Sequence, residues 1–146
     1  MTIAVDFDGT IVEHRYPAIG RERPFATATL RQLLKDGHKL ILWTVREGEL
    51  LDEAVEWCKA KGVRFYAINS FFDEDADEGV GKENNNPSFS RKLKVDCFID
   101  DRNVGGLPDW SAIYQIISRK ITFEDYLEEQ AAGGESAPKK KHWWNF

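Results

Sequence analysis

The feature that most constrains the fold is a short apolar run that ends in two acidic side chains and a glycine. Residues 3–5 are small or apolar, as expected of a strand buried on both faces of a sheet. Asp6 and Asp8 follow, and Gly9 indicates that the chain turns there, which lets Asp8 swing toward whatever Asp6 faces. Such a carboxylate pair offers the oxygen ligands that Mg²⁺ prefers, although an isolated pair is equally consistent with a strand capped by an Asx turn.

The rest of the chain alternates between buried-strand and amphipathic-helix patterns. Strands are expected over residues 39–43, 63–68, 93–99 and, as a short fifth strand, 113–117; helices are expected over 25–35, 49–61 and 122–130. Pro24 suits the first turn of the first helix, and Thr122 suits the N-cap of the last, with Asp125 at N3. The alternation predicts right-handed crossovers and a three-layer, Rossmann-like α/β domain with a central parallel sheet.

Composition restricts the class of protein. The chain has 146 residues, of which 42% are hydrophobic and 31% charged, as in an ordinary globular domain. The net charge of −5 argues against a large nucleic-acid footprint. The sequence shows neither a signal-peptide pattern nor an apolar run long enough to span a membrane. Cys58 and Cys97 lack metal-ligand spacing and are expected to be buried thiols, so we expect a cytoplasmic protein.

Chemically useful side chains follow three of the expected strands. Because the carboxyl ends of parallel strands share one edge of a sheet, and ligands bind at that edge, these side chains are expected to meet. Carboxylates, a hydroxyl and a cation gathered there suit phosphoryl transfer, which needs a metal, an in-line nucleophile and donors to the phosphoryl oxygens. The residues are Asp6 and Asp8, Thr44 and Arg46, and Asp100 and Asp101.

These segments resemble the four motifs of the haloacid dehalogenase (HAD) superfamily. Residues 6–10 are similar to its first motif, residues 42–44 to the second, Lys92 to the third and residues 98–101 to the fourth. The match covers approximately residues 1–117. Four motifs in the right order, each after a suitable strand, are a far more specific signal than the first motif alone.

The resemblance implies a role for each acid. Asp6 would be the nucleophile and a Mg²⁺ ligand, and Asp8 the general acid/base, with its main-chain carbonyl on the metal. Asp100 and Asp101 would complete the metal site. We favour Asp101 as the direct ligand and Asp100 as the water-mediated one, an order that the sequence leaves open.

The resemblance also implies the phosphoryl contacts. Thr44 would hydrogen-bond the transferring group, together with the backbone N–H of Val45. Lys92 would bridge the Asp6 carboxylate and the phosphoryl group, and would keep Asp6 ionised beside other acids. Lys94 is the alternative third-motif lysine, and we favour Lys92 because it stands before the expected strand.

Three further polar side chains near the motifs have competing interpretations. Arg46 either grips a substrate anion with its planar fork or pairs on the surface with Glu47 or Glu49. His14 lies in the loop after the first motif and is expected to be solvated rather than to line the entrance. Arg102 is expected to brace the loop after the acidic pair.

No cap domain is expected. The first helix and second strand occupy most of the chain between Thr10 and Thr44, and residues 69–90 read as a polar loop too short for a domain. An uncovered site suits a phosphate on a macromolecule, or a neighbouring subunit of a homo-oligomer supplies the lid. Residues 1–130 are assigned to the core, and the basic-aromatic tail over residues 131–146 is expected to dock on the core or on a neighbouring subunit.

The sequence therefore predicts a capless, Mg²⁺-dependent phosphatase that hydrolyses a phosphomonoester through an aspartyl-phosphate on Asp6. Two alternatives stay open at this point. One is a HAD-like module that binds a phosphorylated ligand or partner without turnover. The other is a phosphatase acting on a polynucleotide or a protein.

Overall fold

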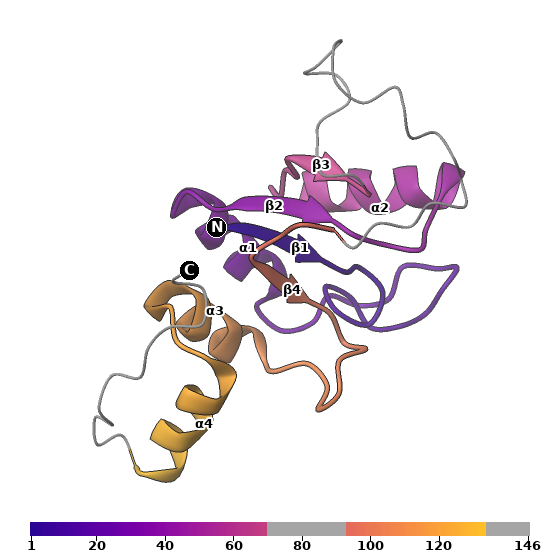
Figure 1. Cartoon of the computed structure of the whole chain (residues 1–146). Coiled ribbons are helices and arrows are strands. Elements are labelled where there is room, and N and C mark those ends of the chain that lie inside the picture. The colour runs from indigo at the N-terminus through magenta and orange to yellow at the C-terminus, as the bar shows by residue number, and fades with distance from the viewer. Residues whose placement is uncertain (70–92, 134–146) are drawn as a thin grey trace.

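The computed structural model describes residues 1–69 and 93–133, and the part of the chain that it describes forms an α/β domain (Figure 1). The strands are β1 (Thr2–Val5), β2 (Lys39–Leu42), β3 (Ala67–Ile68) and β4 (Cys97–Ile99). The helices are α1 (Ala26–Lys35), α2 (Gly48–Ala60), α3 (Trp110–Arg119) and α4 (Phe123–Ala131). None of the described helices is long and apolar enough to cross a membrane.

The sheet is parallel throughout, with the strand order β3-β2-β1-β4. Strand β1 is central, and its Val5 pairs with Leu42 on one side and with Ile99 on the other. In Figure 1 the strands point the same way, and α3 and α4 lie on the β4 side of the sheet. The predicted Rossmann-like α/β class with a central parallel sheet is confirmed. In the described ranges, β1 and β2 are separated only by loop and α1, with no inserted cap.

The central strands are buried on both faces, as their unbroken apolar runs predict. Residues 3–5 and 40–42 are all at most 1% exposed. On one face, Val5 and Leu42 join a core with Leu30 of α1, Cys58 of α2 and Ile113 of α3. This packing fixes the strands, so the residues directly after them have little freedom of position.

Several predicted elements are confirmed with small shifts in their ends. Helices α1, α2 and α4 lie where the patterns indicate, and α4 has the expected capping box between Thr122 and Asp125. Pro24 is not in the first turn of α1, because Phe25 at the N-cap adopts a left-handed conformation and the helix starts at Ala26. Strands β3 and β4 are shorter than predicted.

The predicted strand over residues 113–117 is wrong, because this segment lies inside α3. Its isoleucines favour a strand by propensity, but Trp110, Ile113 and Ile117 are buried at helical spacing against the sheet. The side chain of Asp109 accepts a hydrogen bond from the backbone N–H of Ala112 and caps the helix. Burial of the helical face therefore overrides local propensity.

The predicted docking of the tail cannot be followed, because residues 134–146 lie outside the described residues.

Helix α3 also anchors the loop that follows β1. The indole N–H of buried Trp110 donates to the carbonyl oxygen of Thr10 at 3.1 Å. We expect Trp110→Phe to lower the free energy of unfolding by about 1–3 kcal/mol, because a buried carbonyl loses its donor and the smaller phenyl ring leaves part of the site unfilled. Urea denaturation measures this loss. Trp57→Phe, at a partly buried ring that packs edge-on against Phe7, is the control, and an equal loss in both variants would contradict the anchoring role.

Candidate functional site

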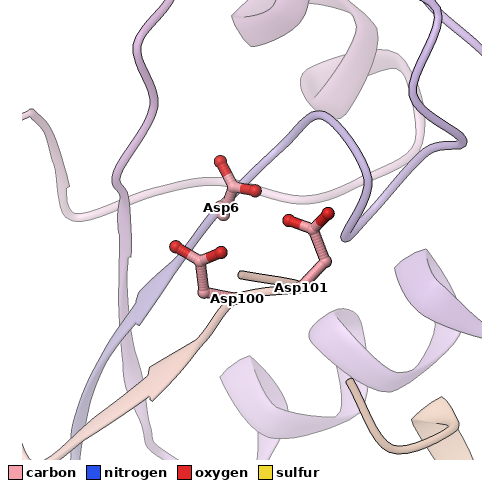
Figure 2. Close-up of side chains that lie close together, drawn as sticks. All are labelled: Asp6, Asp100 and Asp101. Carbon is pink, nitrogen blue, oxygen red and sulfur yellow. The ribbon is translucent and has the colours of Figure 1, made fainter. Parts of the chain in front are cut away.

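Three carboxylates meet at the carboxyl edge of the sheet (Figure 2). Asp6 follows β1, and Asp100 and Asp101 follow β4, its hydrogen-bonded neighbour. One oxygen atom from each side chain lies within 4.8 Å of the other two. The structure thus brings together three of the four acids that the sequence predicts for the metal site.

Thr10 links the two loops that carry these acids. Its hydroxyl donates to an Asp6 carboxylate oxygen at 3.0 Å and accepts from the backbone N–H of Asp101, also at 3.0 Å. The residue is fully buried. Sequence reasoning assigned Thr10 no role, although a hydroxyl directly after the Asp8-Gly9 turn was the available signal.

Asp6 is an unusual acid in this setting. Burial raises its pKa from 3.8 to about 7, and the nearby charge of Asp100 acts in the same direction, whereas the hydrogen bond from Thr10 opposes the rise. Without a cation, Asp6 therefore holds a proton to a much higher pH than an ordinary carboxyl group does. A bound cation would favour its ionised form.

Gly9 allows the loops to approach each other. Its φ of +84° lies in the left-handed region, and a Cβ atom at this position would lie 2.3 Å from a carboxylate oxygen of Asp101. Only glycine tolerates both conditions. The acid cluster therefore depends on the absence of a side chain at residue 9.

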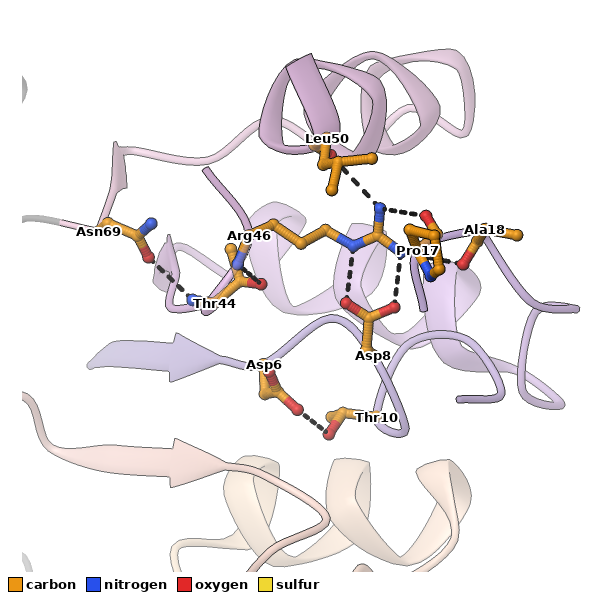
Figure 3. Close-up of polar contacts among 9 residues, drawn as sticks. All are labelled: Asp6, Asp8, Thr10, Pro17, Ala18, Thr44, Arg46, Leu50 and Asn69. Atoms are coloured by element: carbon orange, nitrogen blue, oxygen red, sulfur yellow. Dashed lines mark hydrogen bonds and ion pairs between the residues drawn. The ribbon is translucent and has the colours of Figure 1, made fainter. Parts of the chain in front are cut away.

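Asp8 has a different partner from the other acids. Its two carboxylate oxygens accept hydrogen bonds from Nε and Nη2 of Arg46 at 2.6 and 2.7 Å (Figure 3). The side chains of Arg46 and Asp8 are 0% and 7% exposed. The two short distances and the low exposure of both side chains identify a buried, bidentate ion pair. The hydrogen bonds to Asp8 raise the pKa of Arg46.

Both interpretations of Arg46 from the sequence need correction. Its partner is neither Glu47 nor Glu49, so the surface ion pair is wrong. Its remaining N–H groups donate to the carbonyl oxygens of Pro17, Ala18 and Leu50. The guanidinium thus has no donor left for a substrate anion in this arrangement, because the protein already uses every one of them.

A pocket of about 390 Å³ opens beside the acids. Thr44 and the 80%-exposed Val45 line it, as the sequence predicts for residues that follow β2. The backbone N–H of Thr44 donates to the Asn69 side chain, and its hydroxyl oxygen accepts from the backbone N–H of Arg46. The lining consists of Asp6, Asp8, His14, Tyr16, Trp43, Thr44, Val45, Asn69, Asp100 and Arg102.

Several pocket residues were missed or misjudged from the sequence. His14 is exposed, as expected, and also lines the pocket; Arg102 lines the pocket too, although it was expected only to brace its loop. Tyr16 and Asn69 had no assigned role. The signal for Asn69 was its place directly after β3, at the same sheet edge as the acids.

The lysine of the expected third motif is not tested. Lys92 lies outside the described residues, and its role stays a prediction. Lys94 is exposed and does not line the pocket.

The donor set of the acid cluster fits a hard divalent cation. Asp6, Asp100 and Asp101 offer carboxylate oxygens, the ligands that Mg²⁺ favours. The Asp8 side chain is held by Arg46, so any contact of this residue with a cation falls to its main-chain carbonyl.

Comparison with known proteins places the chain beside a solved structure. No family model matches it, and no curated protein does. A conserved protein from Bacteroides thetaiotaomicron is 61% identical in sequence, with a TM-score of 0.73, over 85% of this chain and 94% of that one. The chain belongs to the family of this conserved protein. The comparison shows that a relative shares the fold, and it assigns no activity to this chain.

We expect Gly9→Ala to disrupt the acid cluster. The new Cβ would collide with Asp101 in a backbone conformation that alanine resists, so Asp101 has to move away from Asp6. Isothermal titration with Mg²⁺ should show at least about tenfold weaker binding. Gly37→Ala, also at positive φ but with open space around it, is the matched control. Equal effects of the two substitutions would contradict the steric argument.

We also expect Asp6 to make the metal-free protein less stable as pH rises. The folded state holds a proton with a pKa of about 7 that the unfolded state releases near 3.8, so stability falls between pH 4 and 7. Asp6→Asn removes this loss and should raise the free energy of unfolding at pH 8 by on the order of 1–2 kcal/mol, allowing for partial exposure.

Urea denaturation in a chelator at pH 4, 6 and 8 measures the effect. The difference between Asp6→Asn and the wild type should be smallest at pH 4 and should shrink again when Mg²⁺ is added at pH 8. A difference independent of pH would contradict the assignment.

Proposed function

We propose that this protein is a capless, Mg²⁺-dependent phosphatase of the HAD type that hydrolyses a phosphomonoester through an aspartyl-phosphate on Asp6. The observation that carries the proposal is the meeting of Asp6, Asp100 and Asp101 at one sheet edge, beside the pocket lined by Thr44. A nucleophilic carboxylate, metal-ligating acids and a hydroxyl donor are the parts that this chemistry needs.

Asp6 has the central role in the proposed mechanism. Asp6, Asp100 and Asp101, with the Asp8 carbonyl, would hold Mg²⁺, which when bound neutralises charge on the phosphoryl oxygens. A carboxylate oxygen of Asp6 attacks phosphorus as the bond to the leaving oxygen breaks. Water then hydrolyses the acyl phosphate and regenerates Asp6.

Other pocket residues would bind and orient the substrate. The hydroxyl oxygen of Thr44 accepts a hydrogen bond from the backbone N–H of Arg46, so the Thr44 O–H is directed toward a different acceptor. In the proposal that acceptor is an oxygen of the phosphoryl group. Arg102 is a cation on the pocket wall and can pair with a substrate anion. In the proposal Asp8 protonates the leaving oxygen and later takes a proton from water, while Lys92 keeps its predicted place beside Asp6.

The size of the pocket favours a small substrate. At about 390 Å³ it lies at the low end of the range for small-molecule sites. This supports a low-molecular-weight phosphomonoester over a polynucleotide or phosphoprotein.

A cytoplasmic location is part of the proposal and is supported by two free cysteines, Cys58 and Cys97. A lid from a second subunit stays a prediction.

One observation favours a second candidate function, a module that binds phosphorylated ligands without turnover. Each oxygen of Asp8 accepts a hydrogen bond from Arg46, so in this arrangement one lone pair of each oxygen belongs to the ion pair rather than to acid/base work. A binding module needs the cation site and the pocket but no acid. Turnover is therefore the property that separates the two candidates.

Hydrolysis of p-nitrophenyl phosphate tests the proposal. The wild type should release nitrophenolate only with Mg²⁺, and Asp6→Asn should reduce kcat by at least about 1000-fold, because the nucleophile is lost. Asp96→Asn is the control: Asp96 accepts a hydrogen bond from Thr2 at the start of β1, at the opposite edge of the sheet. We expect it to retain wild-type activity.

Two results would each overturn part of the proposal. Mg²⁺ binding without hydrolysis of any member of a panel of nucleotides, sugar phosphates and aryl phosphates would favour the binding module. Hydrolysis that persists in Asp6→Asn would exclude this nucleophile.

A further inference from the structure

Arg46 connects parts of the site that lie far apart in the sequence. It follows β2, yet its guanidinium lies between the loop after β1 and the first turn of α2 (Figure 3). Its five N–H groups make two hydrogen bonds to Asp8 and one each to the carbonyl oxygens of Pro17, Ala18 and Leu50. No N–H group is left over.

The aromatic contacts strengthen this arrangement. The guanidinium carbon lies 5.2 Å from the centre of the Phe7 ring and 5.3 Å from that of Tyr16. Both distances are within the range of a cation–π contact. Arg46 is therefore held by hydrogen bonds in its plane and by two rings.

Two of the groups that Arg46 holds line the pocket. Asp8 and Tyr16 both face the cavity, and Pro17 and Ala18 directly follow Tyr16 in the chain. The orientation of the Asp8 carboxyl group is thus fixed relative to this part of the pocket wall. A surface ion pair would not have this effect, because its side chains are free to move in water.

We propose that Arg46 is a positioning residue that sets the direction of the Asp8 carboxyl group and ties it to the pocket wall at Tyr16–Ala18. The inference rests on the proposed phosphatase function, in which Asp8 gives a proton to the leaving oxygen as the P–O bond breaks. Arg46 itself touches no reacting atom. It acts through Asp8.

The arginine fork is specific for this task. A planar guanidinium meets both carboxylate oxygens and still has three N–H groups for the loop carbonyls, whereas a lysine ammonium has three in all. Arg46→Lys keeps the buried positive charge but loses the two-point hold on Asp8. It therefore disturbs orientation with the least change in charge.

The test compares two esters that differ in their need for a proton. A p-nitrophenolate leaves readily without one, whereas the alkoxide of n-butyl phosphate does not. In Arg46→Lys we expect kcat to fall at least about tenfold more for the butyl ester than for the nitrophenyl ester, in the same direction as in Asp8→Asn. The double variant should be no slower than Asp8→Asn alone, because Arg46 acts through Asp8.

Arg21→Gln is the matched control, because it removes an exposed arginine–carboxylate pair, Arg21 with Glu13, from the loop after β1 that also carries Asp8. It should hydrolyse both esters like the wild type. Thermal unfolding followed by circular dichroism checks that each variant is folded.

The outcomes distinguish the positioning role of Arg46 from the proposed phosphatase function. An active wild type in which Arg46→Lys slows both esters by the same factor, or slows neither, overturns the positioning role and leaves the proposed function in place. A double variant much slower than Asp8→Asn alone also overturns it. A wild type that hydrolyses neither ester overturns the proposed function and the positioning role together.

Discussion

The site depends on the parallel pairing of β1 with β4. The backbone N–H of Asp6 donates to the carbonyl oxygen of Ile99 at 3.0 Å, which continues the ladder one residue beyond the strands. The acids that follow each strand are therefore brought side by side by backbone hydrogen bonds, without any attraction between them. Carboxylates repel one another, so packing of the sheet and its helices has to supply the free energy that holds them together.

Three features keep the acids in place: a bridging hydroxyl, the space left by a glycine and an indole hydrogen bond. The Thr10 hydroxyl bridges the two loops, the Gly9 hydrogen leaves room for Asp101, and the Trp110 indole holds the Thr10 carbonyl. Asp8 is separated from this cluster by its pairing with Arg46. One loop thus divides its two acids between a site that concentrates negative charge and an ion pair that cancels it.

The sequence predicts much of this architecture. Unbroken apolar runs identify β1 and β2, and the strand-end rule brings Asp6, Asp100 and Asp101 to one edge, because these features depend on local pattern and on general properties of parallel sheets. The helix over residues 113–117 was missed because burial outweighs the preference of isoleucine for strands. The partner of Arg46 was missed because a fit between a guanidinium and a carboxylate depends on loop geometry, which periodicity does not describe.

The hydrogen bond from Trp110 to Thr10 also affects how variants of this protein should be interpreted. It makes α3 part of the support for the acids, although the helix contributes no side chain to the pocket. A substitution that loosens the packing of Ile113 or Ile117 can therefore shift the loop after β1 while the acids stay intact in sequence. In a random mutagenesis screen, loss-of-function variants should fall on two groups of positions: the acids themselves and the buried face of a helix behind them.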